Sequence, residues 1–275
     1  VSWGLEMAYE DWCISQIAKK AGNMELANEY AKKAEYYKRY LDPETKMMRP
    51  VMGDGSFRTP FNPRYSSHMK SDYTEGNAFQ WSFFAPHDMD NFIAAIGGKK
   101  ELETRLDTLF TTSSQIDGAE ASGDITGLIG QYAHGNEPSH HIVHLYNYVN
   151  QSWKAQQLID TILHTQYFNN PNGLSGNEDC GQMSAWYVLN AMGFYQVCPG
   201  SPIYSVGRPI FDKVTINLPN GKVFEIIANN NSRTNKYIQS IRLDNILLES
   251  PFFMHSDIMK GGKIIMEMGN TPVKQ

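Results

Sequence analysis

The sequence has little of what marks several common classes of protein. Its three cysteines, Cys13, Cys180 and Cys198, are an odd number spaced far apart, so they indicate no disulfide framework. No apolar run approaches the roughly 20 residues that a membrane-spanning helix needs. The 29 acidic and 24 basic residues are mixed along the chain, and the formal net charge is −5. Because the concentrated positive charge of a nucleic-acid-binding surface is absent, neither nucleic acid nor a membrane is an expected partner.

What the sequence does contain is enough apolar material for a large core. It has 275 residues and 41% hydrophobic content, which fits one large domain or two. Aromatic residues make up 12%, with 15 tyrosines the most numerous. Aromatic rings suit sugar binding, and they suit a large core equally well. The chain begins Val1-Ser2-Trp3, without Met or a signal peptide, so we expect it to be a piece of a longer polypeptide.

The first two hundred residues carry mostly helical spacing of apolar residues. The segment 46–71 interrupts this spacing. It is polar and rich in Gly, Pro, Arg and Met, which predicts a long ordered surface loop of the kind that often has a function. The predicted helices are 5–21, 24–41, 77–84, 88–96, 99–111, 139–150, 152–166 and 181–192.

Near residue 200 the periodicity changes from helical to extended. Segments 213–218, 223–228, 237–243 and 263–268 alternate or are rich in β-branched residues, and Asn220-Gly221 is a strong hairpin signal between the first two. We therefore expect a mainly α protein with an antiparallel β tail. The predicted domains are 1–200 and 201–275.

One segment, Gly135-Asn136-Glu137-Pro138-Ser139-His140-His141, has the character of a catalytic loop. Pro138 suits a first helical position, which would put Glu137 at the entrance of a helix. His140 and His141 would then lie one turn away on the same face, within reach of a carboxyl group or a sugar. The alternatives are an ordinary helix start with an acidic first turn and two histidines that only fill the interior.

Two further loops have the same character. Residues 173–182 contain Asn177, Glu178, Asp179 and Gln182, and residues 73–81 contain Glu75, Asn77, Gln80 and Trp81. Glu178 and Gln182 are spaced i, i+4, so they could present two oxygen atoms on one side if Asp179 begins a helix. Trp81 and the neighbouring amides could form a sugar platform. The alternatives are a helix start followed by a surface Gln, and a buried aromatic core.

Together with His255-Ser256-Asp257, these segments closely resemble the calcium-dependent α-mannosidases of glycoside hydrolase family 92. The resemblance covers nearly the whole chain. It implies an (α/α)6 toroid preceded by an N-terminal β-sandwich, and a periplasmic or secreted location. The eight predicted helices are fewer than the twelve of a complete toroid. We therefore expect the second part of that toroid and a β region that closes onto it, with the missing N-terminal half of the polypeptide as a partner.

The resemblance also implies catalytic roles. Glu137 falls on the family's general acid. An inverting enzyme places its base roughly 6.5–9.5 Å from the acid, with water between them. Glu178, Asp179 and Asp257 compete for the role of base. Asp257 is favoured because it matches the aspartate of the family's His-Ser-Asp motif, and Asp179 is second. As an alternative, Asp257 would be an ordinary cap residue before the Gly261-Gly262 turn.

A calcium ion takes six to eight oxygen ligands. The expected protein ligands are Glu178, Gln182 and Asn136, with Asn77 as a further amide. The expected substrate-binding residues are Glu75, Asn77, Gln80, Trp81, His140, His141, Asn177 and Glu178. Family members that cleave the α-1,2 linkage carry a His-Glu pair where this chain has Asn177-Glu178. Asn177 therefore leaves α-1,3, α-1,4 and phosphodiester-linked mannose open.

The expected function is release of terminal α-linked mannose from N-glycan or mannan-type oligosaccharides, with inversion and with calcium. A non-catalytic carbohydrate-binding or scaffold module on the same toroid is the alternative. Such a module would not need Glu137 together with a second acid. A phosphorylase is a third reading, but it would require an arginine cluster, and none stands beside the acidic loops.

Overall fold

The computed structural model describes residues 1–274, which form two compact units, residues 1–139 and 140–274. The division falls inside the segment 135–141, and the predicted boundary near residue 200 is not where the units separate. Helices and sheets of the second half share one unit. Within residues 1–274, no helix is both long and apolar enough to cross a membrane.

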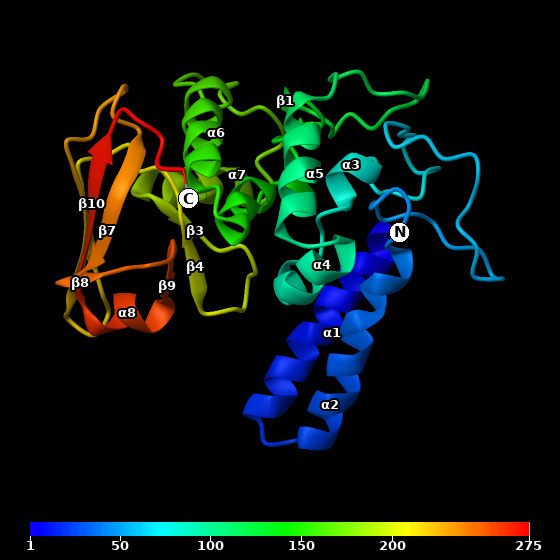
Figure 1. Ribbon diagram of the computed structural model, residues 1–275, viewed down its shortest axis with the longest axis horizontal. Coiled ribbons are helices and arrows are strands. Elements are labelled where there is room, and N and C mark those ends of the chain that lie inside the picture. Colours follow the sequence, from blue (N-terminus) through cyan, green and yellow to red (C-terminus); the bar gives the residue numbers. More distant parts are fainter. Residues whose placement is uncertain (275) are drawn as a thin grey trace. The chain divides into compact units, whose positions relative to one another are not determined.

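The first unit begins with two antiparallel helices, α1 (Ser2–Lys20) and α2 (Met24–Lys33), which lie side by side (Figure 1). Asn23 starts α2, where its side chain accepts a hydrogen bond from the Leu26 N–H at 3.1 Å. After α2 the chain tightens into a 3-10 helix, η1 (Ala34–Tyr40). The helix predicted over 24–41 is therefore two helices of different pitch.

The long loop predicted around residues 46–71 is irregular, as expected, and is anchored by a buried arginine. Arg49 donates to Asp42 Oδ2 and to the Arg58 carbonyl oxygen, both at 2.8 Å. Burial alone would raise the pKa of Asp42, but hydrogen bonds from Thr45 and Arg49 outweigh it and lower that pKa to about 2. Because Asp42 stays ionised, Arg49 keeps its counter-charge and the loop keeps its position.

Short elements complete the first unit. Gly97 and Gly98, both at positive φ, separate two of its helices, and the second of these has the predicted bounds 99–111. The elements are α3 (Ala78–Trp81), η2 (Pro86–Asp88), α4 (Met89–Ile96), α5 (Lys99–Thr111), β1 (Leu128–Ile129), β2 (Tyr132–Ala133) and η3 (Glu137–Ser139).

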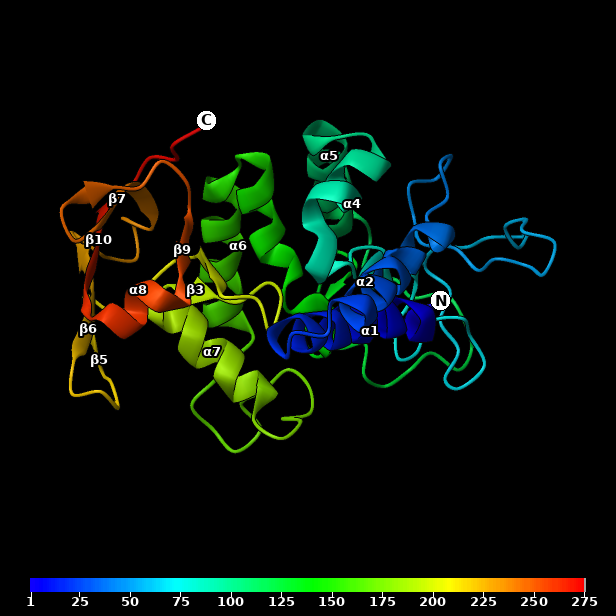
Figure 2. The same cartoon turned by 90° about the horizontal axis from the view of Figure 1, so that it is seen from below.

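The second unit combines helices with two sheets (Figure 2). Helix α6 contacts η4, α7 and β7. The helices are η4 (Ile142–Val149), α6 (Ser152–Thr165), α7 (Gln182–Met192) and α8 (His255–Lys260). The strands are β3 (Phe194–Tyr195), β4 (Ile203–Val206), β5 (Lys213–Asn217), β6 (Val223–Asn229), β7 (Tyr237–Leu243), β8 (Ile246–Leu247), β9 (Phe252–Met254) and β10 (Gly262–Gly269).

The larger sheet has the strand order β5-β6-β10-β7-β8 and is mixed. The predicted hairpin at Asn220-Gly221 is present, with β5 antiparallel to β6. Strand β10, however, runs parallel to β6 and antiparallel to β7. The prediction of a purely antiparallel sheet was therefore wrong, because the last strand enters at the centre instead of at an edge.

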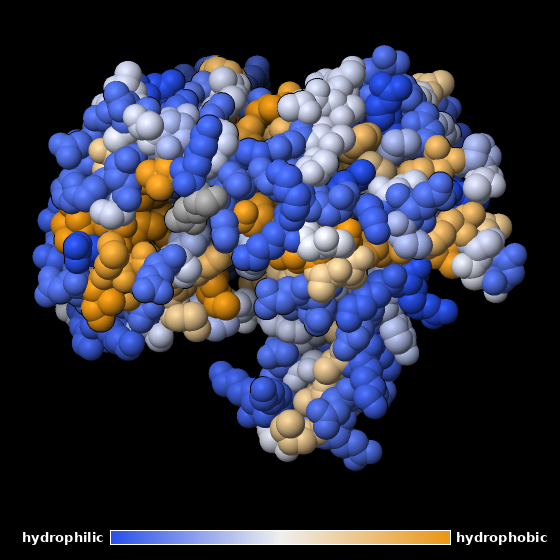
Figure 3. Space-filling view, viewed as in Figure 1, coloured by the Kyte–Doolittle hydropathy of each residue, from blue (hydrophilic) through white to orange (hydrophobic). Residues whose placement is uncertain are grey.

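One face of this sheet is the apolar core of the unit. Burial alternates along β6, where Phe224, Ile226 and Ala228 are inside. Ile264 and Met266 of β10 lie in the same cluster. At the far edge, Ile246 of β8 is 70% exposed, and the space-filling view shows apolar surface in this region (Figure 3).

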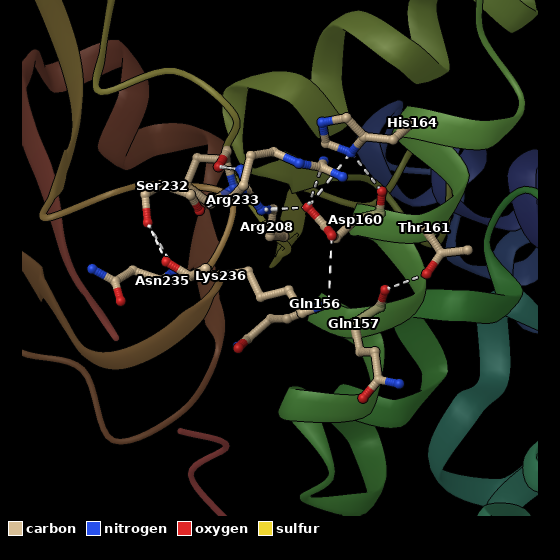
Figure 4. Close-up of polar contacts among 12 residues, drawn as sticks. Gln156, Gln157, Asp160, Thr161, His164, Arg208, Ser232, Arg233, Asn235 and Lys236 are labelled. Carbon is tan, nitrogen blue, oxygen red and sulfur yellow. Dashed lines mark hydrogen bonds and ion pairs between the residues drawn. The ribbon is translucent and has the colours of Figure 1, made fainter. Parts of the chain in front are cut away.

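A buried carboxylate attaches this sheet to α6 (Figure 4). Asp160 of α6, with its side chain 7% exposed, faces Arg208, Arg233 and Lys236. Arg208 Nε lies 3.0 Å from Asp160 Oδ1 without the alignment of a hydrogen bond, so the contact is an ion pair. Arg208 also donates to the Ser232 carbonyl at 2.9 Å. One negative charge thus holds the β6–β7 loop and the segment after β4.

We predict that Asp160→Asn destabilises the second unit by about 3–5 kcal/mol, because it leaves the buried Arg208 without a counter-charge. Chemical denaturation followed by hydrogen exchange in β7 measures the loss. Asp212→Asn, at an exposed position of the same unit, is the control and should change little. Equal effects of the two substitutions would contradict this role of Asp160.

Candidate active site

The segment 135–141 forms tight turns instead of one helix. Glu137 begins the 3-10 turn η3 with Pro138 inside it, and its N–H donates to Asn136 Oδ1 at 3.2 Å. The next helix starts only at Ile142. The predicted helix from residue 139 is thus displaced, and the expectation that His140 and His141 share a helical face with Glu137 was wrong.

The loop of Glu137 is tied to the loop of Glu75 within the first unit. Asn136 Nδ2 donates to the Glu75 carbonyl oxygen at 2.9 Å. Glu75 has a left-handed backbone with φ +49 and an exposed side chain. Left-handed conformations cost energy in residues other than glycine and often mark functional loops. The structure therefore brings two of the sequence-predicted carboxylate loops together.

A network of buried amides supports the Glu75 loop. Asn77 Nδ2 donates to Gln131 Oε1 at 2.9 Å, and Gln80 Nε2 donates to the Gln131 carbonyl at the same distance. Asn77 and Gln80 also bond each other in a capping box that starts α3. All three side chains are buried. Their polar atoms bind protein, so these contacts explain Asn77 and Gln80 as supports of the loop and not as sugar ligands.

Trp81 has a similar position. It is buried, and its indole N–H donates to the Thr74 carbonyl at 2.8 Å. A Cβ atom on Gly76 would lie 2.8 Å from Trp81 Nε1 and 3.2 Å from Gln80 Oε1. Only glycine fits there. Trp81 is thus a wall against which the Glu75 turn folds, and the predicted sugar platform would need a ring that is exposed.

In the second unit, His140 is held by α7. Gln182 Nε2 lies 3.0 Å from His140 Nδ1 and 3.2 Å from Tyr195 Oη. Trp186, one turn further along α7, donates its indole N–H to the His140 carbonyl at 2.9 Å. Because the Gln182 amide donates to Nδ1, the proton of a neutral His140 lies on Nε2. His141 is buried as well.

Glu178 holds the loop before α7 against the start of that helix. Its carboxylate accepts hydrogen bonds from the Gly181 N–H and, at 3.2 Å, from the Ser184 N–H. Hydrogen bonds with Ser184 and Gly181 lower the pKa of Glu178, which stays ionised at the helix N-terminus. The helix begins at Gln182, so the assumption that Glu178 and Gln182 are related by helical spacing was wrong.

Asp179 and Cys180 adopt left-handed backbones, with φ +51 and +55. The side chains of Asn177 and Asp179 are exposed. Asp179 therefore presents a carboxylate to solvent from a strained turn, three residues before Gln182. The structure brings Asp179, Gln182 and His140 into one region of the second unit.

Comparison with known proteins identifies the family. Residues 1–270 match the model of the glycosyl hydrolase family 92 catalytic domain. The chain belongs to glycosyl hydrolase family 92.

Solved structures of family 92 have the same fold. An α-mannosidase of Bacteroides thetaiotaomicron in complex with mannoimidazole is 40% identical, with a TM-score of 0.92 over 98% of this chain and 36% of its own. An inverting mannosidase of the same organism is 33% identical, with a TM-score of 0.84 over 98% and 37%. A protein of Arthroderma benhamiae named an uncharacterized secreted glycosidase is 23% identical over 98% and 35%. The chain thus spans about a third of these relatives.

Asp257, the carboxylate favoured as base from the family 92 motif, lies beside the sheet. It is in the first turn of α8, which contacts β6 and β9, and both ribbon views show α8 apart from the loop that leads into α7 (Figures 1 and 2). Asp257 accepts from the Met254 N–H at 2.9 Å and from Lys260 Nζ at 3.2 Å. These two hydrogen bonds lie at the start of α8, where Asp257 caps the helix.

The expected calcium ligands of family 92 fit an ion in part. The Gln182 amide contacts His140 and Tyr195 through its NH₂ group, which leaves the carbonyl oxygen for a cation, and Glu178 is ionised. Asn136 fits less well, because its oxygen and nitrogen both bond backbone atoms. Residues 1–274 contain no group of three or more His, Cys, Asp or Glu side chains suited to a metal. Glu178 and Gln182 are the candidates that remain.

Two further titratable groups, Glu6 and His144, are not indicated by any sequence pattern. Glu6 of α1 lies near the Glu75 loop, and partial burial, followed by the charges of Glu10 and Glu75, raises its pKa. His144 is fully buried in η4, where Nε2 lies 2.9 Å from Asn190 Oδ1. Helical spacing over residues 5–21 predicts only a helix, and His144 lies beyond the 135–141 motif, so neither group has a local sequence signal.

We predict a loss of stability in acid that depends on His144. Burial lowers the pKa of His144 to about 4, below its unfolded value near 6.5. The unfolded chain therefore takes up the proton first, and stability falls as pH falls from about 6.5 to 4. The contribution approaches ~3 kcal/mol. Thermal melts over this range should show a smaller slope for His144→Gln than for the unchanged protein, and parallel slopes would contradict the prediction.

Proposed function

We propose that this chain carries catalytic residues of an exo-acting α-mannosidase that removes terminal mannose from N-glycan or mannan-type oligosaccharides. The observation that carries the proposal is the Glu137 turn, which Asn136 fixes against the Glu75 loop, in a chain of family 92. The related solved structures named as mannosidases support the substrate class. A relative named as secreted supports a periplasmic or secreted location. The rest of the toroid and a β-sandwich would lie in further chain.

In the proposed mechanism, Glu137 is the general acid. It is partly exposed, and Asn136 orients its backbone. Its carboxyl group would donate a proton to the oxygen of the leaving sugar as the glycosidic bond breaks. An ionised carboxylate would accept a proton from a water molecule as that water attacks the sugar carbon from the opposite face. The product then has the inverted configuration.

We propose Asp179 as the base, in place of Asp257. Asp179 is exposed in a strained turn that leads to Gln182, and Gln182 contacts His140, which follows Glu137 by three residues. Asp257 instead bonds its own helix. Strain at a functional loop is retained when the geometry serves the chemistry.

The same loop would position the substrate. We propose that His140, which Gln182 holds in place, and the exposed Asn177 contact the substrate, and that Asn177 selects the leaving sugar. With Asn177 in this place, we propose α-1,3, α-1,4 or phosphodiester-linked mannose as the preferred substrates. When bound, calcium would hold two adjacent sugar hydroxyls and favour ring distortion, with Glu178 and Gln182 as its ligands from this chain.

The role of Glu137 can be tested by the leaving group. Glu137→Gln should slow hydrolysis of mannosides with poor leaving groups by roughly 10²–10⁴-fold, because proton donation is lost. Activated aryl mannosides should be hydrolysed with a much smaller loss. The assay compares kcat/KM for the two substrate types in a full-length protein, and an equal loss for both would show that Glu137 is not the acid.

The choice of base is tested by a matched pair of substitutions. Asp179→Asn should abolish turnover and leave sugar binding in place, since only water activation is removed. Asp257→Asn should keep turnover near that of the unchanged protein, with some loss of thermal stability from the α8 cap. The reverse pattern of activities would return the role to Asp257. Azide rescue with an inverted product would identify whichever residue is the base.

Calcium dependence is expected in activity and in stability. A calcium-selective chelator should abolish hydrolysis, and added calcium should restore it and raise the melting temperature, because a ligand that binds only the folded state stabilises it. Gln182→Ala should remove the calcium-dependent shift in melting temperature, whereas Asn136→Ala should keep it. Full activity in metal-free buffer would exclude a calcium requirement.

A further inference from the structure

A pocket of about 540 Å³ lies between α7 and the loop 167–174, in the second unit. The hairpin-like loop 167–174 forms one wall, and Ser184, Tyr187 and Val188 of α7 form the other. The volume is in the usual range for small-molecule sites. None of the residues named above as catalytic, substrate-binding or metal-binding lines it.

The pocket lies on the opposite face of α7 from His140. Side chains advance by about 100° per residue along a helix, so Gln182 and Trp186 project together, toward His140. Ser184 and Val188 are two positions beyond each of these and project away. The pocket therefore lies on a different face of α7 from His140. Two of its residues adjoin the candidate site: Tyr167 stacks on Trp186 with ring centroids 6.0 Å apart, and the Ser184 N–H donates to Glu178 at 3.2 Å.

Backbone hydrogen bonds hold the wall formed by the loop in one conformation. Tyr167 and Leu174 form a β-bridge, and the Phe168 N–H donates to the Gly173 carbonyl at 2.8 Å. A Cβ atom on Gly173 would lie 1.9 Å from the Phe168 carbonyl oxygen, so only glycine allows this close approach. The Asn172 N–H donates to Asn170 Oδ1 at 3.0 Å. A wall fixed in this way requires little ordering when a ligand binds.

The lining combines exposed apolar surface with amides. Phe168 is 57% exposed and Val188 is 52% exposed, and Asn169 and Asn170 are exposed beside them. A hexopyranose has one face of C–H groups that stacks on a ring, and hydroxyls that bond amides. The lining residues carry no charge, which disfavours a phosphate or another ionic ligand.

We propose that this pocket is a second carbohydrate-binding site, which takes one hexopyranose unit of a mannose oligosaccharide. The sugar would lie against Phe168 and Val188, with its hydroxyls toward Asn169 and Asn170. The site binds without cleaving, since its lining includes no carboxylate. The substrate class rests on the proposed function, but binding at this pocket does not require catalysis.

The test uses the full-length protein with Glu137→Gln, which slows hydrolysis, and linear α-mannotriose as the probe. Saturation-transfer NMR is recorded with and without saturating mannoimidazole, the compound bound in the structure of a related α-mannosidase. We expect a mannotriose signal that survives mannoimidazole. Adding Phe168→Ala or Val188→Lys should weaken this remaining binding about five- to tenfold. Phe211→Ala, at a half-exposed ring elsewhere in the unit, is the control and should not change it.

The outcomes are distinct. Loss of the whole signal on adding mannoimidazole, or equal effects of Phe168→Ala and Phe211→Ala, would overturn the second site. If the unchanged protein neither hydrolyses mannosides nor binds mannoimidazole, the proposed function fails. In that case, a mannotriose signal that is sensitive to Phe168→Ala would still establish the pocket as a sugar site.

Discussion

Hydrogen bonds from side-chain amides hold the loops of this protein that carry its candidate catalytic carboxylates. Asn136 donates to the Glu75 carbonyl, Asn77 and Gln80 donate to Gln131, and Gln182 contacts His140. Irregular loops lack the repeating partners of a helix or sheet, so each buried backbone group needs a separate one. Amides can donate and accept at the same time, which lets one side chain join two segments. The position of Glu137 depends on these bonds more than on any helix.

The second unit depends on charge in a similar way. Asp160 is one carboxylate among three cations, and it joins α6 to the segments that precede β5 and β7. A buried ion pair adds little net stability compared with an apolar replacement. Removing only one partner is strongly destabilising, because it leaves the other charge buried without a counter-charge. The arrangement therefore fixes where the sheet attaches to α6. Apolar contacts such as those of Phe224 and Ile264 then supply most of the favourable energy.

The spacing of apolar residues predicted the bounds of individual helices and strands. Helix 99–111 and strand 237–243 have their expected bounds because apolar periodicity alone determines which face is buried. The motif around Glu137 identified the family. The place of β10 between β6 and β7 was not predictable from periodicity, because pairing partners of a strand are chosen by the whole sheet.

The sequence predicted which loops form the candidate site better than it predicted what each residue does there. The sequence around an amide in a polar loop is the same whether the amide binds a ligand or the backbone. Only the burial of Asn77 and Gln80 showed that they support the loop. The spacing of Glu178 and Gln182 suggested a helical pair, but the left-handed turn at Asp179 breaks that relation. Asp257 matched a motif, and its bonds to Met254 and Lys260 became visible only in the structure.

The central place of β10 also determines when the larger sheet can form during translation. Strands β6 and β7 make no ladder with each other, and each pairs with β10, which leaves the ribosome after both. Until residues 262–269 emerge, the β5–β6 and β7–β8 pairs each present an open edge where β10 will pair. Exposed edges of this kind invite pairing with other chains. The nascent chain is therefore prone to aggregate, and in need of a chaperone, until β10 is made.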